Sequence, residues 1–206
     1  MVVGVSGRYC AGKSQVSEIL RQHGYERLDV DRLGHDALQS EAERVVAAFG
    51  RGILSETAGG DDGGGTPEID RRKLGRIVFE DQEARRGLED IVHPVMRKRV
   101  EERAEESRRR GERLVVDAAL LFYMGLHHSC DLVLWVDAPV LIRFYRAWKR
   151  DDLGPGQILA RLRAQRHITP QPYMHDVDIR RVMNWGSRDR LEREVAELPG
   201  VLPESS

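Results

Sequence analysis

Residues 7–14 read Gly-Arg-Tyr-Cys-Ala-Gly-Lys-Ser and fit the pattern G-x-x-x-x-G-K-[ST], whose backbone N–H groups can surround phosphate oxygens. Gly7 allows the turn out of a strand, and Gly12 lets the backbone approach a phosphate closely. The Lys13 ammonium can reach the β and γ phosphates of a nucleotide, and the Ser14 hydroxyl can bind Mg²⁺. The segment follows a predicted strand and opens a predicted helix, so we interpret it as a phosphate-binding loop (P-loop).

Three acidic residues follow predicted strands at the edge where α/β sheets bind ligands. Asp29 and Asp31 would share one face if their segment stays extended, and a carboxylate there could accept the proton of an attacking hydroxyl. Alternatively, Asp31 is the N-cap of the helix that contains Leu33, and the residues alone do not decide between these roles. Asp117 could orient Mg²⁺ through water or could simply end its strand.

Cationic side chains are concentrated in a stretch predicted to be helical, residues 141–166. Arginines can clamp a phosphoryl group once a lid closes, although we expect most of them to be ordinary solvated residues. The basic residues considered are Arg143, Arg146, Lys149, Arg150, Arg161, Arg163 and Arg166. Separately, Cys10 lies beside Lys13 in the P-loop, which predicts a lowered thiol pKa and, as a hypothesis, sensitivity to oxidation.

Short apolar runs alternate with helical patterns along the chain, which predicts an α/β core with a parallel sheet. The five predicted strands are residues 2–5, 25–29, 114–116, 132–136 and 179–183. Helices are predicted at about 70–80 and 82–93, and Pro94 is expected to interrupt before a further charged helix ends near Arg110. Residues 57–67 are predicted to form a solvated loop, because they offer almost nothing to bury.

Composition excludes several classes of protein. Of the 206 residues, 33 are Lys or Arg and 34 are Asp or Glu, for a net charge of −1, whereas a protein that coats nucleic acid is normally basic. The apolar stretch 114–126 contains an aspartate and is shorter than the roughly 20 residues of a membrane span. Two cysteines without a CxxC pair, and a start without a charged leader, favour a reducing cytoplasm.

Together these segments resemble the dephospho-CoA kinase family. The P-loop alone would indicate only a superfamily, but the second acid after it, the His-Pro pair and the R-x-x-x-R-D pattern are more specific. The matching segments follow the family's order: GRYCAGKS at 7–14, LDVDRLGHDAL at 28–38, IDRRKLGRIVFED at 69–81, LEDIVHPVMRKRV at 88–100, VVDAALLF at 115–122, LVLWVDAP at 132–139, RAWKRDD at 146–152 and RLRAQ at 161–165.

The resemblance implies a P-loop kinase core with a five-stranded parallel sheet flanked by helices, a helical substrate-binding insertion and a lid. The core would comprise residues 1–34, 113–140 and 171–206, the dephospho-CoA-binding insertion 35–112, and the lid 141–170. The implied reaction moves the γ-phosphoryl group of ATP to the ribose 3′-hydroxyl of dephospho-CoA, with Mg²⁺ as cofactor. It implies a cytoplasmic enzyme, a monomer or weak homo-oligomer, with no nucleic-acid or membrane partner.

Matched positions suggest residue roles. Asp31 matches the family's catalytic acid, which favours the general-base alternative, and Lys13 and Arg146 are the other implied catalytic residues. His93 and Leu120, with Asp31, are implied to contact dephospho-CoA, and Ser14 and Asp117 to serve the metal. The implied ATP-binding residues are Gly7, Cys10, Ala11, Gly12, Lys13, Ser14, Gln15, Arg146 and Asn184.

The chain departs from the family pattern at several of its motifs. Arg8, Tyr9 and Cys10 stand where glycine and small residues are usual. Gln15 replaces a common Thr, and Ala119 and Tyr123 replace a Pro and a Glu. The alternatives are another small-molecule P-loop kinase, acting on a nucleoside, a nucleotide or a sugar acid, or a nucleotide-binding protein without catalysis. A GTPase is disfavoured because the sequence has no N-K-x-D motif.

Overall fold

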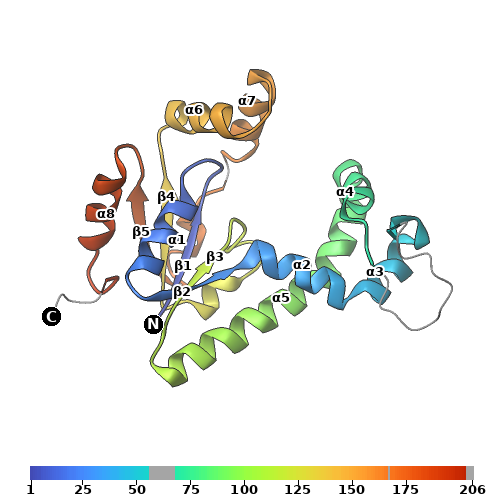
Figure 1. Ribbon diagram of the computed structural model, residues 1–206, viewed down its shortest axis with the longest axis horizontal. Helices are drawn as coiled ribbons and strands as arrows, with labels where there is room; N and C mark the ends of the chain where they lie inside the picture. Colours follow the sequence, from blue (N-terminus) through green and yellow to red (C-terminus); the bar gives the residue numbers. More distant parts are fainter. Residues whose placement is uncertain (56–67, 167, 203–206) are drawn as a thin grey trace. The chain divides into compact units, whose positions relative to one another are not determined.

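The computed structural model describes residues 1–55, 68–166 and 168–202 (Figure 1). Within it the chain forms two compact units, one made of Met1–Asp29 with Val100–Ser206 and one made of Val30–Arg99. The predicted loop at 57–67 lies outside the described residues. In the described part of the chain, no helix is both long and apolar enough to cross a membrane.

A five-stranded sheet forms the centre of the first unit, and its order is β2-β3-β1-β4-β5. All four pairings are parallel, which confirms the predicted α/β class. Every predicted strand is present, with bounds β1 Val2–Gly7, β2 Tyr25–Asp29, β3 Arg113–Asp117, β4 Leu132–Asp137 and β5 Asp178–Met183. The central strands are almost fully buried, because parallel sheets are covered on both faces.

Helices of the first unit cover the sheet, and loops at the carboxyl ends of the strands connect the strands to these helices (Figure 1). On one face Val16, Ile19 and Leu20 of α1 join Leu191 and Val195 of α8 in the main hydrophobic core. On the other face a Cβ on Gly4 of β1 would lie 2.9 Å from Leu121. The helices are α1 Lys13–Gln22, η3 Leu126–Ser129, α6 Val140–Arg150, α7 Pro155–Ala164, η4 Gln171–Tyr173 and α8 Arg188–Ala196.

The second unit is helical and has its own small core of Ala42, Val45, Ile53, Ile69 and Leu74. Its elements are α2 Val30–Ser40, α3 Ala42–Phe49, η1 Arg51–Ile53, α4 Arg71–Glu80 and the first part of α5 Gln82–Arg110. The Asp70 carboxylate caps α4 by accepting hydrogen bonds from the backbone N–H groups of Arg72 (2.8 Å) and Lys73 (3.2 Å), as an N-cap side chain does.

Helix α5 runs through Pro94 without a break, so the predicted interruption is wrong. A proline inside a helix removes one backbone hydrogen bond and crowds the carbonyl four residues earlier. That local cost is offset here by the burial of apolar side chains on one face of the helix. These side chains recur at every fourth position and are Val92, Met96, Val100 and Ala104. Tertiary burial of one helix face therefore outweighs the local preference of proline.

Candidate active site

The P-loop connects β1 to α1 and has the backbone geometry that its glycines predict. Gly12 has φ 96° and precedes the first helical residue, Lys13. A Cβ on Gly7 would lie 2.3 Å from the carbonyl oxygen of Val136, so only glycine fits there. Among the described residues, no side chain caps the N-terminus of α1, and the first N–H groups of a helix have no partner within it. This end of α1 therefore suits an anion such as a phosphate.

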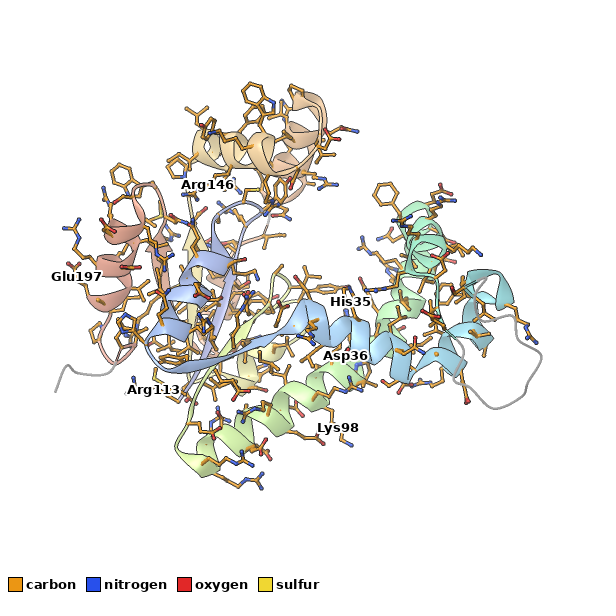
Figure 2. All side chains as sticks on the ribbon, viewed as in Figure 1. His35, Asp36, Lys98, Arg113, Arg146 and Glu197 are labelled. Atoms are coloured by element: carbon orange, nitrogen blue, oxygen red, sulfur yellow. The ribbon has the colours of Figure 1, made fainter. Side chains whose placement is uncertain are left out.

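A hydrogen-bonded network of side chains holds the P-loop at the carbonyl group of Ala11. The carbonyl oxygen of Ala11 accepts from Asn184 Nδ2 (2.9 Å) and from Arg146 Nη1 (3.1 Å). Arg146 Nη2 also donates to Asn184 Oδ1 (3.0 Å), and Asn184 Nδ2 donates to Gln15 Oε1 (2.8 Å). Figure 2 labels Arg146 on α6. The fold thus brings Arg146 and Asn184, which are far away in the sequence, to the P-loop residues Ala11 and Gln15, and all four are predicted nucleotide-binding residues.

Asp117 is a buried carboxylate, 1 % exposed, that lies between two cations. Lys13 Nζ pairs with its Oδ1, and Arg27 donates to its Oδ2 from Nη2 (2.6 Å) and Nε (3.0 Å). Ser14 follows Lys13 in the first turn of α1 and is exposed. Sequence reasoning did not single out Arg27, although the pairing of β2 with β3 places it two residue pairs from Asp117, on the same face of the sheet.

Arg27→Met is predicted to destabilise the protein by about 2 kcal/mol, because it removes a cation from a buried carboxylate. The figure is below the usual cost because Arg27 is itself partly exposed. The loss of stability is measured from urea unfolding curves of the variant and the unsubstituted protein. The control is Arg21→Met, which breaks an exposed pair with Glu18 on α1 and should leave the unfolding midpoint almost unchanged. Equal midpoints for the two variants would contradict the prediction.

The two acids after β2 do not lie on one extended segment. Strand β2 ends at Asp29, which lies opposite Asp117 in the register of β3, and α2 begins at Val30. Asp31 is exposed in the first turn of α2, so it is not the residue that precedes the helix as an N-cap would. Both the shared-face prediction and the N-cap alternative are therefore wrong, because the turn into α2 comes earlier than expected.

The other predicted substrate contacts lie in different elements. His93 is half-buried in α5 of the second unit, and burial lowers its pKa. Leu120 is exposed in the first unit and lines a cavity of about 180 Å³ with Ser6, Phe122, Tyr123 and Tyr173 among its walls. One of its lining residues, Ser6, directly precedes Gly7 of the P-loop, so the cavity is next to the candidate phosphate site.

Cys10 has a strained backbone and a thiol that is harder to ionise than predicted. Its φ of 58° is the only positive value at a non-glycine residue in the described part of the chain. Burial raises the pKa of its thiol, and the nearby Arg150 opposes that shift without cancelling it. The predicted lowering of this pKa is wrong, because desolvation penalises a thiolate.

The arginine-rich stretch is mostly solvated, as predicted. Five of its basic residues are exposed: Lys149, Arg150, Arg161, Arg163 and Arg166. There are two exceptions: Arg146 is half-buried against the P-loop, and Arg143 is only 3 % exposed, with its pKa lowered by burial. Its Nε and Nη1 have no hydrogen-bond partner among the described residues.

His127 lies behind the cavity, packed against the rings of Phe122 and Tyr173. Within the described part of the chain, neither of its ring nitrogens has a hydrogen-bond partner, and the nearest carboxylate oxygen, of Asp176, is 3.7 Å from Nε2. Burial and the neighbouring His128 lower the pKa of His127, and Asp176 only partly opposes them. The folded state therefore favours the neutral ring.

A lowered histidine pKa predicts that stability is lost in mild acid. Below the ordinary histidine pKa of about 6.5 the unfolded chain binds a proton that folded His127 resists, so stability falls as the pH falls. His127→Phe should reduce the fall in Tm between about pH 7.5 and pH 5.5. A smaller slope should persist, because burial also lowers the pKa of His93. Identical slopes before and after the substitution would argue against this role.

Comparison with known proteins agrees with the geometry. A family model described as dephospho-CoA kinase matches residues 1–180. The dephospho-CoA kinase of Bacillus licheniformis is 34 % identical over 202 residues, which cover 96 % of this chain and 94 % of that protein. The dephospho-CoA kinase of Geobacter sulfurreducens is 36 % identical over 203 residues, with 96 % of each chain covered.

Two solved structures share the fold of this chain. A crystal structure of a Thermus thermophilus protein is 31 % identical, with a TM-score of 0.73 over 97 % of this chain and 98 % of that one. The dephospho-CoA kinase of Campylobacter jejuni has the same fold, with a TM-score of 0.67 at 24 % identity over 94 % of this chain and 92 % of that one. The matched P-loop, the sheet order and the extent of these similarities lead to one conclusion: the chain belongs to the dephospho-CoA kinase family.

Proposed function

We propose that this protein transfers the γ-phosphoryl group of ATP to the ribose 3′-hydroxyl of dephospho-CoA, giving coenzyme A and ADP. The observation that carries the proposal is the P-loop, whose Gly12 is backed by the Asn184 amide, in a chain that belongs to this family over most of its length. The P-loop is a phosphate cradle by its chemistry, and family membership supplies the acceptor.

ATP would bind at the end of β1, where the N–H groups of the P-loop and the positive end of α1 attract phosphate. Lys13 would exchange its Asp117 partner for the β and γ phosphates, and Arg27 would still neutralise Asp117 after that exchange. The charge of the buried carboxylate is therefore compensated in both states. The proposed ATP-binding residues are Gly7, Cys10, Ala11, Gly12, Lys13, Ser14, Gln15, Arg146 and Asn184.

The residues present also fit Mg²⁺. This ion prefers oxygen ligands and takes few of them from the protein, since water and substrate phosphates supply the rest. Ser14 offers a hydroxyl in the first turn of α1, and Asp117 offers oxygens that already face cations. Bound Mg²⁺ would neutralise charge on the phosphates. We propose that Ser14 holds the ion directly and that Asp117 orients a water.

Asp31 is proposed as the general base. In the reaction the 3′-oxygen of dephospho-CoA forms a bond to the γ-phosphorus, the bond from that phosphorus to the β,γ-bridging oxygen breaks, and ADP leaves. The proton of the hydroxyl passes to the Asp31 carboxylate. Lys13 and Arg146 would stabilise the transferring phosphoryl group, and His93 and Leu120 would contact the acceptor.

The predicted division of labour remains part of the proposal. Residues 1–34, 113–140 and 171–206 would bind ATP, residues 35–112 would bind dephospho-CoA, and residues 141–170 would form the lid. We also propose that the enzyme is cytoplasmic and that it acts as a monomer or a weak homo-oligomer.

A panel of acceptors tests the proposal. The protein is incubated with ATP, Mg²⁺ and either dephospho-CoA, a nucleoside, a nucleotide or a sugar acid, and ADP release is followed. Dephospho-CoA should give turnover at least about 10²-fold above the rate without an acceptor. Faster turnover with another acceptor would replace the proposed substrate, and ATP binding without turnover of any acceptor would indicate a non-catalytic protein.

A further inference from the structure

Tyr9, one of the unusual residues inside the P-loop, connects this loop to the hairpin formed by α6 and α7. The backbone N–H of Tyr9 donates to Gln165 Oε1 (2.6 Å), at the end of α7. The Tyr9 hydroxyl hydrogen-bonds to the Asp151 carboxylate, at the end of α6. Two polar contacts therefore tie one loop residue to both helices of the hairpin.

Apolar packing adds to these hydrogen bonds. The hairpin has a small core of Ala147, Ile158 and Leu162, and both Tyr9 and Cys10 pack against it. The side chain of Tyr9 thus reaches out of the P-loop into the hairpin. A glycine at this position could not make this contact, because it has no side chain.

Two arginines of the hairpin lie over the Tyr9 ring. The guanidinium carbons of Arg150 and Arg161 are 5.4 Å and 5.8 Å from its centroid, within the range of cation–π attraction. Arg150 Nε is also 2.7 Å from the Asp151 carboxylate. Arg150 and Tyr9 together lower the pKa of Asp151 to about 2, so this carboxylate stays charged at neutral pH and keeps both partners.

We infer that Tyr9 is a positioning residue, which fastens the α6–α7 hairpin to the P-loop and holds Arg150 and Arg161 beside the phosphate site. The inference rests on the proposed phosphoryl transfer, in which arginines stabilise charge on the moving group. A guanidinium that is already held loses less conformational freedom when the phosphate arrives. Tyr9 acts through the arginines and takes no part in the bond changes.

The same contacts could be ordinary packing with no consequence for catalysis, so the test needs a variant matched for structure. Tyr145 supplies it, because it lies on α6 of the same hairpin, is 51 % exposed and has Lys149 over its ring at 4.8 Å. Tyr145→Leu removes an aromatic ring and a cation–π contact from the hairpin but leaves the sequence of the P-loop unchanged. Tyr9→Leu makes the equivalent change at the loop, and Tyr9→Phe keeps the ring while removing the hydroxyl.

Tryptic cleavage within residues 141–166 reports how firmly the hairpin is held, and it is measured without any acceptor. Tyr9→Leu should be cleaved about tenfold faster than Tyr145→Leu, and its kcat should fall by about 10- to 100-fold, because small displacements of catalytic groups have costs of this size. Its KM for ATP should change less than its kcat. Tyr9→Phe should be intermediate in both measurements.

Two results would overturn the inference: equal cleavage of Tyr9→Leu and Tyr145→Leu, or faster cleavage of Tyr9→Leu with an unchanged kcat. Failure of the proposed function would look different. The unsubstituted protein would then give no turnover with dephospho-CoA, while the cleavage comparison would still show whether Tyr9 holds the hairpin, and the kcat comparison would use the acceptor that the panel identifies.

Discussion

Asp31→Asn lowers kcat by at least about 10²-fold if Asp31 is the general base, because positioned proton acceptors contribute factors of this order. The amide is nearly the same size as the carboxylate but accepts no proton at neutral pH. Since Asp31 is exposed in the first turn of α2, the substitution should change Tm little. Steady-state turnover with ATP and dephospho-CoA measures kcat, and titration with ATP alone should give an unchanged Kd.

Asp36→Asn is the matched control for this experiment. Asp36 is an exposed aspartate on the same helix, and the exchange removes the same charge from α2. It should retain kcat within about twofold, since surface charges away from the reacting atoms contribute little. The general-base assignment fails if Asp31→Asn keeps its full kcat. It also fails if both variants lose activity equally, because the effect would then be one of charge rather than of proton transfer.

Gly12→Ala should weaken ATP binding by about 10²-fold or more and should also destabilise the protein. A Cβ at this position would lie 1.9 Å from Asn184 Nδ2. That amide has little freedom to move, because it donates to Ala11 and Gln15 and its oxygen accepts from Arg146. Displacing it disturbs the phosphate cradle, where each lost hydrogen bond to a charged group costs about 1.5–3 kcal/mol.

Backbone strain alone would also harm this variant, so a second glycine separates the two causes. Gly24 has φ 85°, similar to the φ of Gly12, but no atom of the described residues lies within 4 Å of the Cβ that alanine would add there. Gly24→Ala should therefore cost only about 1–2 kcal/mol of stability, the price of a left-handed alanine, and should keep its affinity for ATP. Equal ATP affinities of the two variants, measured by calorimetry, would show that the Asn184 contact does not matter.

Local sequence patterns were sufficient for much of the fold. The three central strands are short, buried apolar runs, and all five predicted strands are present within one or two residues at their ends. The P-loop was equally predictable, because its glycines and the start of α1 are consecutive. Pro94 shows where local reasoning fails, since its cost to α5 is a local quantity whereas the burial of Val92 and Met96 depends on the whole fold.

By itself, then, the sequence determined the fold class, the phosphate-binding loop and the family. The fold class and the loop follow from neighbouring residues, whose backbone preferences act over a few ångströms, whereas the family was inferred from the resemblance of the ordered motifs. The tertiary structure alone decided which distant side chains complete the site. Arg27 meets Asp117 across 90 positions, Tyr9 meets Asp151 across 142, and Asn184 meets Ala11 across 173. Such contacts depend on strand order and helix packing, which no local pattern encodes.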